Sequence, residues 1–190
     1  MPPATDATDG VPYELGMQFQ SSVAGTITAI RFWRADSEAY ADNSHVGRIW
    51  AADGTPLTSV SFVNETAGGG WQEQLLAVPL AIAANTTYTV SVNILSHYVY
   101  TYQGLMGPIV NGDLASIAGS SLGSCTGGPA NANGVFGNPG TFPNSSFNCA
   151  NYFRDVQFTP EVVPVPAAAW LFMSGVGVLG LARRRAQRTS

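Results

Sequence analysis

The segment TTYTVSVNI, residues 86–94, decides the fold class. Its side chains alternate along the chain, with apolar residues at Tyr88, Val90, Val92 and Ile94 and polar residues at Thr87, Thr89, Ser91 and Asn93. A period of two is the repeat of a β-strand, because successive side chains point to opposite faces of the sheet. The segment therefore predicts an antiparallel strand with one buried face and one face in water.

Seven similar segments accompany this strand. Their sequences are YELGMQFQS, GTITAIRFWRA, HVGRIWAADGTPLTSVSFV (two strands), GGGWQEQLLAVPLAI, HYVYTY and NYFRDVQFTP. Asp53-Gly54 between two of them is a strong hairpin signal. About eight short strands, with no convincing helix before residue 165, predict an all-β domain over 13–160: an antiparallel β-sandwich, jelly-roll-like in size.

The composition is typical of a protein built from strands, and it excludes one class of binding partner. Charged residues make up 11% of the chain and no lysine occurs, which is unusual for a helical protein. Residues 1–160 hold eleven acids and four arginines, whereas the other arginines follow the apolar segment near the C-terminus. A domain this acidic is repelled by phosphate backbones, so nucleic-acid binding is excluded.

Residues 104–150 are rich in Gly, Asn, Ser and Pro and contain Cys125 and Cys149. A long loop of this kind is unusual in a compact domain, and a disulfide would hold it in place. The alternative is a pair of reduced thiols in a cytosolic protein. No metal site is expected from these residues, because there is no Cys-x-x-Cys spacing and His45 and His97 are the only histidines.

The chain ends in a segment that differs from the rest. A proline-rich linker at 161–166 leads into residues 165–182, which carry no charge, and these end at Arg183, Arg184 and Arg185 in a basic tail, 183–190. As a helix, 165–182 would span roughly 27 Å, close to the hydrocarbon thickness of a bilayer. We expect a single C-terminal transmembrane helix with residues 183–190 in the cytoplasm and 1–164 outside. The alternative, a buried core helix, fits the arginines and prolines less well.

This ending closely resembles the PEP-CTERM sorting signal of Gram-negative bacteria. The proline motif is read from Val163, Pro164, Val165, Pro166 and Ala167, followed by the apolar helix and the arginines. The resemblance implies cleavage by an exosortase-type membrane protease-transpeptidase, after transient anchoring in the inner membrane. The mature protein would then reach the outer surface or extracellular matrix. Residues 1–12, expected to be disordered, lack the features of a signal peptide, so we expect an export leader upstream of Met1.

The order of strand segments resembles a bacterial secreted family, domain of unknown function 4082. The similarity rests on YELGMQF, AGTITAIRFW, GRIWAADGTPL, GGGWQE, PLAIAANTTYTVS and NYFRDVQFTP, between Tyr13 and Pro160. The resemblance implies a β-sandwich module in exported, often surface-associated or polysaccharide-active proteins. It implies no catalytic residues.

Aromatic side chains are the candidate ligand contacts. Trp33, Trp50 and Trp71 lie in or beside predicted strands, where they either pack in the core or stack on sugar rings. Trp71 follows a triple-glycine turn and is the one we expect to be exposed. Three tyrosines on one face of the next strand either form a shallow platform or cover the edge of the core: Tyr98, Tyr100 and Tyr102.

The acidic residues do not define a catalytic site. Residues 34–43 concentrate carboxylates that either hold Ca²⁺ or form a solvated turn, and the spacing of an EF-hand is missing. Asp155 is expected to point away from Arg154, and a buried Asp155 could form a structural pair with Arg31. We therefore expect a non-enzymatic surface or matrix protein without a cofactor, whose module binds polysaccharide. The alternatives are a glycan hydrolase and a purely structural adhesin.

Overall fold

The computed structural model describes residues 4–38, 44–125 and 132–161. Within these ranges the chain forms thirteen strands and a single helical turn. In order they are β1 (Thr5–Thr8), β2 (Tyr13–Ser21), β3 (Gly25–Arg34), β4 (Val46–Ala51), β5 (Pro56–Ser61), β6 (Gly70–Ile82), β7 (Tyr88–Ile94), β8 (His97–Tyr100), β9 (Val110–Asn111), β10 (Leu114–Ser116), α1 (Gly119–Leu122), β11 (Val135–Gly137), β12 (Ser145–Ser146) and β13 (Arg154–Pro160).

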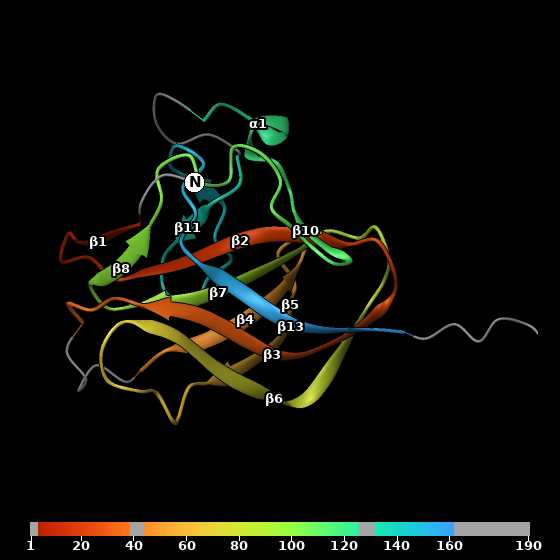
Figure 1. Cartoon of the computed structure of the whole chain (residues 1–190), viewed down its shortest axis with the longest axis horizontal. Helices are drawn as coiled ribbons and strands as arrows, with labels where there is room; N and C mark the ends of the chain where they lie inside the picture. The colour runs from red at the N-terminus through yellow and green to blue at the C-terminus, as the bar shows by residue number, and fades with distance from the viewer. Residues whose placement is uncertain (1–3, 39–43, 126–131, 162–190) are drawn as a thin grey trace, which may run out of the picture.

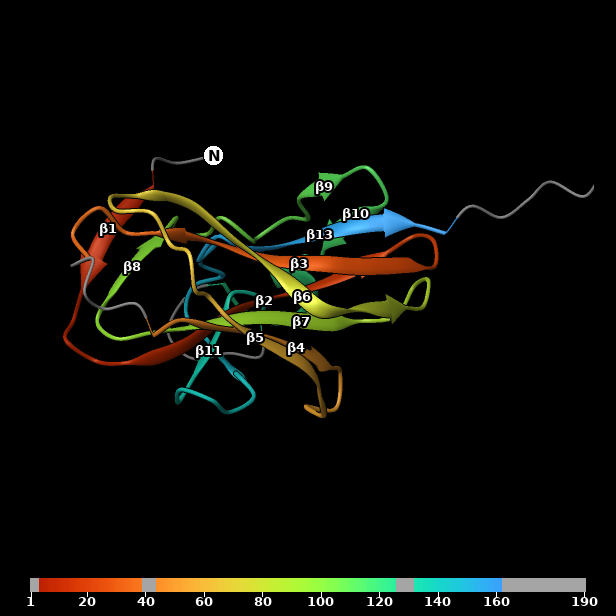
Figure 2. The same cartoon turned by 90° about the horizontal axis from the view of Figure 1, so that it is seen from below.

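Two antiparallel sheets pack face to face, as predicted (Figures 1 and 2). The larger sheet has the order β12-β11-β2-β7-β4-β5, with β10 and β9 added beside β2, and the smaller sheet has the order β13-β3-β6. A separate pair, β1 and β8, lies at one end. The apolar side chains of β7 point between the sheets, where Val90 and Val92 are fully buried against Ile27 and Ile30 of β3.

All eight predicted strands are present: β2 to β8 and β13. The five additional strands are short. Four lie in the segment 104–150, which was expected to be a loop, and β1 lies within the N-terminal segment expected to be disordered, where it pairs with β8. Short strands with little periodicity cannot be predicted from sequence patterns, because their pairing depends on neighbours that are distant in the sequence.

The predicted wet face of β7 is wrong for two of its residues. Thr89 and Ser91 are buried, with exposed fractions of 1% and 0%. Residues 137–143 pack over this face, and the Phe142 ring lies 5.8 Å from the ring of Trp50. The larger sheet is therefore covered on both sides, by the smaller sheet and by the long segment (Figure 2).

The long segment is fastened to β2 by a buried asparagine. The Asn133 side chain accepts a hydrogen bond from the Gln18 N–H and donates to the Gln18 and Ile117 carbonyls, all within 2.8 Å. It thereby acts as a strand partner between the stretches of β2 that pair with β10 and β11. The predicted Cys125–Cys149 disulfide is confirmed and closes the same segment.

A buried carboxylate connects four parts of this arrangement. Glu14 of β2 is fully buried, and its side chain accepts hydrogen bonds from the Ser91 hydroxyl, the Arg48 guanidinium and the Gly140 N–H. Ser91 in turn accepts one from the Trp50 indole at 2.7 Å. Glu14 therefore joins β2, β7, β4 and the covering segment 137–143.

No helix within the described ranges is long and apolar enough to cross a membrane. The segment expected to be transmembrane, 165–182, lies outside those ranges. So do the proline motif at 163–167 and the arginines Arg183, Arg184 and Arg185.

Glu14→Gln should destabilise the domain by roughly 2–4 kcal/mol, because an amide cannot accept from all three donors and leaves Arg48 without its counter-charge. Urea unfolding measures the loss, and limited proteolysis should show faster cleavage within 137–143. Glu161→Gln, at the exposed end of the domain, is the control. Equal unfolding free energies for the two variants would contradict this assignment.

Candidate functional site

The outer face of the smaller sheet carries two exposed tryptophans. Trp33 of β3 lies opposite Trp71 of β6 in the ladder, and both point away from the core because they alternate with the buried Phe32 and Gln72. Their exposed fractions are 37% and 40%, and their ring centroids lie 5.7 Å apart in an edge-to-face arrangement. The prediction that Trp71 is exposed is confirmed. Trp33 is also exposed, whereas Trp50 packs in the interior.

A charged group beside the tryptophans holds one of them in place. The Arg31 guanidinium carbon lies 4.8 Å from the centroid of the Trp71 ring, within the range of a cation–π contact. Arg31 also lies 3.4 Å from the Glu73 carboxylate and 3.6 Å from that of Asp155. We call Arg31, Trp33, Trp71, Glu73 and Asp155 the Trp face.

Asp155 occupies the position expected from the sequence. It pairs with Arg31 and lies on the opposite face of β13 from Arg154, which is buried. Burial raises the pKa of Asp155, while the Val156 N–H and Arg31 act in the other direction. The Asp155 carboxylate accepts that N–H at 2.8 Å, which occupies a backbone donor of β13.

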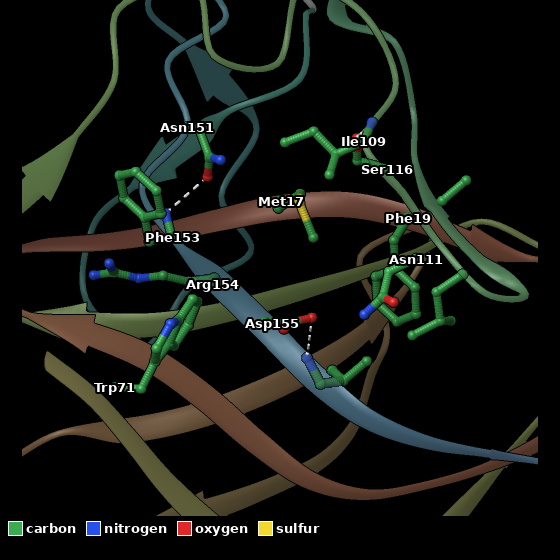
Figure 3. Close-up of a pocket in the computed structure, with 13 residues that line it drawn as sticks. Met17, Phe19, Trp71, Ile109, Asn111, Ser116, Asn151, Phe153, Arg154 and Asp155 are labelled. Carbon is green, nitrogen blue, oxygen red and sulfur yellow. Dashed lines mark hydrogen bonds between the residues drawn. The ribbon is translucent and has the colours of Figure 1, made fainter. Parts of the chain in front are cut away.

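A groove continues from the Trp face around β13 (Figure 3). We call this cavity of about 250 Å³ the edge groove. It is lined by Met17, Phe19, Trp71, Ile109, Asn111, Leu114, Ala115, Ser116, Asn151, Phe153, Arg154, Asp155 and Val156. Trp71 and Phe153 lie at one end of it and Asn111 at the other (Figure 3). The groove is largely apolar with a few amide and carboxylate groups, a composition typical of ligand sites.

The three candidate tyrosines are only partly brought together. Tyr98 and Tyr100 have ring centroids 6.0 Å apart and pack against a small aromatic core that includes Tyr152. Tyr102 follows the end of β8, is 48% exposed and lies outside the lining of the edge groove. Tyr98 instead lines a second hollow, described below.

The acidic stretch 34–43 is used in part for internal contacts. Asp36 accepts a hydrogen bond from the Gly69 N–H, and Glu38 is buried beside Arg34 and His45. Residues 39–43 lie outside the described ranges. Among the described residues no cluster of His, Cys, Asp and Glu has the geometry of a metal site.

Sequence reasoning missed a buried ionic cluster at the end of β3. The His45 ring lies between two carboxylates, with Nε2 3.0 Å from Glu38 and Nδ1 2.8 Å from Glu65. Arg34 lies 3.4 Å from Glu38 and 3.5 Å from Glu65, so two cations face two anions. All four side chains are at most 1% exposed, so no ligand reaches them and the cluster serves the fold.

The two carboxylates favour the charged form of His45. Burial by itself lowers the pKa of His45, but the hydrogen bonds and charges of Glu38 and Glu65 outweigh it and raise the pKa above its usual value. Nδ1 forms a hydrogen bond with Glu65 and Nε2 lies 3.0 Å from Glu38, so a ring that is protonated on both nitrogens places its positive charge between two carboxylates. The buried Arg154, whose pKa burial lowers to about 10, adds a further positive charge that interacts with Glu38.

The raised pKa of His45 makes stability depend on pH. Its contribution is fully present below about pH 6.5 and is lost as the pH rises through the higher pKa of the folded state. His45→Gln should lower the unfolding free energy by roughly 3–5 kcal/mol at pH 6 and flatten its decline between pH 6 and 9. Urea unfolding across this range measures both effects. A decline in His45→Gln as steep as that of the wild type would show that His45 is not the titrating group.

Comparison with known protein families identifies the family of the domain. The sequence model of a family described as Domain of unknown function (DUF4082) matches residues 1–154. No curated protein matches the chain. The match covers β1 to β12 and the first residue of β13. It therefore includes every strand of the larger sheet, and β3 and β6 of the smaller sheet. The chain therefore belongs to the domain of unknown function 4082 family.

Proposed function

We propose that this chain is an exported, non-catalytic module that binds polysaccharide through the Trp face and the edge groove. The observation that carries the proposal is the pair of exposed tryptophans, Trp33 and Trp71, fixed side by side on a rigid sheet. Indole rings offer large, stiff apolar surfaces on which the C–H faces of sugar rings stack. An exposed pair of this size is otherwise unfavourable in water.

The polar groups around the tryptophans suit sugar hydroxyls. Arg31 offers donors, Glu73 and Asp155 offer acceptors, and Gln157 donates to Glu73 at 3.0 Å. These side chains already hold one another in place, so little conformational entropy is lost on binding. The groove beyond Trp71 has room for a further part of an extended glycan chain.

Hydrolysis of the glycan is the second candidate, favoured by the raised pKa of Asp155. A glycosidase needs one carboxyl group that keeps a proton and a second that is ionised. On the Trp face both carboxylates contact the Arg31 guanidinium, whose charge opposes the rise in the pKa of Asp155. We therefore favour binding over turnover.

Export and sorting form the second part of the proposal. The Cys125–Cys149 disulfide supports an oxidising compartment, because disulfides are rare in the cytosol. The C-terminal segment, with its proline motif, apolar stretch and arginines, supports membrane insertion followed by exosortase-type processing. The domain would then be delivered to the cell surface or matrix.

Trp71→Ala should weaken polysaccharide binding by at least about tenfold, because it removes one of the two stacking rings and the one that also lines the edge groove. Affinity electrophoresis of the full chain against a panel of neutral and acidic polysaccharides measures this, in a detergent without sugar groups. Tyr102→Ala removes an aromatic ring of similar exposure outside the groove and should bind as the wild type does. Binding that both variants retain would remove the Trp face from the proposal.

Release of reducing ends from a bound polysaccharide, abolished by Asp155→Asn, would instead establish the hydrolase. If the chain neither binds nor cleaves any polysaccharide, a purely structural adhesin remains.

The mature protein from the native host should lack the residues after about Pro166. Mass spectrometry of the surface fraction measures its C-terminus. Replacing Pro164 and Pro166 by alanine should retain the intact tail in the inner membrane. An intact tail in the wild-type surface protein would contradict sorting by cleavage.

A further inference from the structure

A second hollow, the aromatic cleft, lies near the β1–β8 pair. Its volume is about 330 Å³. It is lined by Asp9, Tyr13, Leu15, Tyr98, Phe136, Phe147 and Tyr152. Five of these seven residues are aromatic, and Asp9 is the one with a formal charge. The rings come from distant parts of the chain: β2, β8, β11 and the loops before β13.

The aromatic rings of the cleft stand nearly perpendicular to one another. Tyr13 meets Tyr98 at 86° and Phe136 at 81°, with ring centroids 6.4 Å and 5.9 Å apart, and Tyr98 meets Tyr152 at 72°. These contacts are edge-to-face, and all four rings line the cleft. Leu15 and Tyr152 are buried, whereas Phe147 is 49% exposed, so the cleft runs from the core to the surface.

The single carboxylate of the cleft is held in a fixed position. Asp9 accepts the Tyr13 hydroxyl at 2.8 Å and the Val11 N–H at 3.1 Å. The hydrogen bond to Asp9 is the main cause that raises the pKa of Tyr13 to about 12, so this phenol stays neutral. The nearby Arg154 lies outside the lining of the cleft. Its guanidinium donates a hydrogen bond to the Tyr152 carbonyl, and its guanidinium carbon lies 5.7 Å from the centroid of the Phe32 ring.

We propose that the aromatic cleft binds a small quaternary ammonium group, of the kind carried by choline. Ring faces attract a cation through their negative quadrupole, and a methylated ammonium is easily taken out of water because it has no N–H groups to satisfy. Asp9 supplies the opposite charge at the rim, and the acidic domain as a whole raises the local concentration of cations. This site is separate from the Trp face and does not depend on polysaccharide binding.

Choline is the probe that tests the proposal, and its neutral carbon analogue, with a tert-butyl group in place of trimethylammonium, is the matched ligand. The two have nearly the same shape, so only the charge distinguishes them. Calorimetry on the full chain at constant ionic strength should give a dissociation constant for choline tighter than about 10 mM. The analogue should bind at least about tenfold more weakly. Equal binding of both, or no binding of choline, would overturn the proposal.

Two variants locate the site without disturbing the core. Phe147→Ala removes an exposed wall and Asp9→Asn removes the charge, and each should weaken choline binding by at least about threefold. Tyr102→Ala is the control for loss of an exposed ring outside the cleft. If choline binds but both variants bind it as tightly as the wild type, the cation lies elsewhere and the assignment fails.

The same ammonium group occurs in free cations and in lipid head groups. Phosphocholine separates these sources, because its phosphate must lie near Asp9 if the head group enters the cleft. We expect phosphocholine to bind at least about threefold more weakly than choline, which would identify a free cation as the ligand. Equal affinity would support ammonium recognition with a head group as the source.

Discussion

The structure depends first on the buried carboxylate of Glu14. A long segment without regular periodicity covers one side of the larger sheet. Contacts with threonine and serine side chains alone would stabilise it little in that position. Glu14 gives it a fixed partner, because the Gly140 N–H, Arg48 and Ser91 all converge on the same two oxygens. Since an unpaired buried carboxylate is very costly, each of these contacts favours the others. The position of Phe136, and with it one wall of the aromatic cleft, follows from this arrangement.

The two faces of β3 have opposite roles. The inner face ends in Arg34, which belongs to the sealed ionic cluster, whereas the outer face presents Arg31 and Trp33 to solvent. Arginine therefore stabilises the fold at position 34 and lies at the surface at position 31. The period of the strand decides between them, because it assigns each side chain to one face.

The alternation of strands made most of the fold predictable. It identified eight strands and the exposure of Trp71, since both follow from period two and local turns. The Arg31–Asp155 pair depends on the pairing of β13 with β3, which the alternation does not determine. The same alternation places Arg34 and Arg154 on inward faces with Phe32 and Val156, so it contained a signal for the buried charges. The partners of Arg34 could not be predicted, because Glu38 and Glu65 reach it from loops. The packing of residues 137–143 over Ser91 and the presence of the aromatic cleft could not be predicted either, since both combine segments that are distant in the sequence.

The hydrogen bond from Val156 N–H to the side chain of Asp155 has a consequence for crowding. β13 is an outer strand of the smaller sheet, and the unpaired backbone groups of such strands can recruit strands from other molecules. Here one donor is already occupied, a negative charge stands beside it, and Pro160 ends the strand. Densely packed copies would therefore resist edge-to-edge polymerisation through β13 and remain separate units.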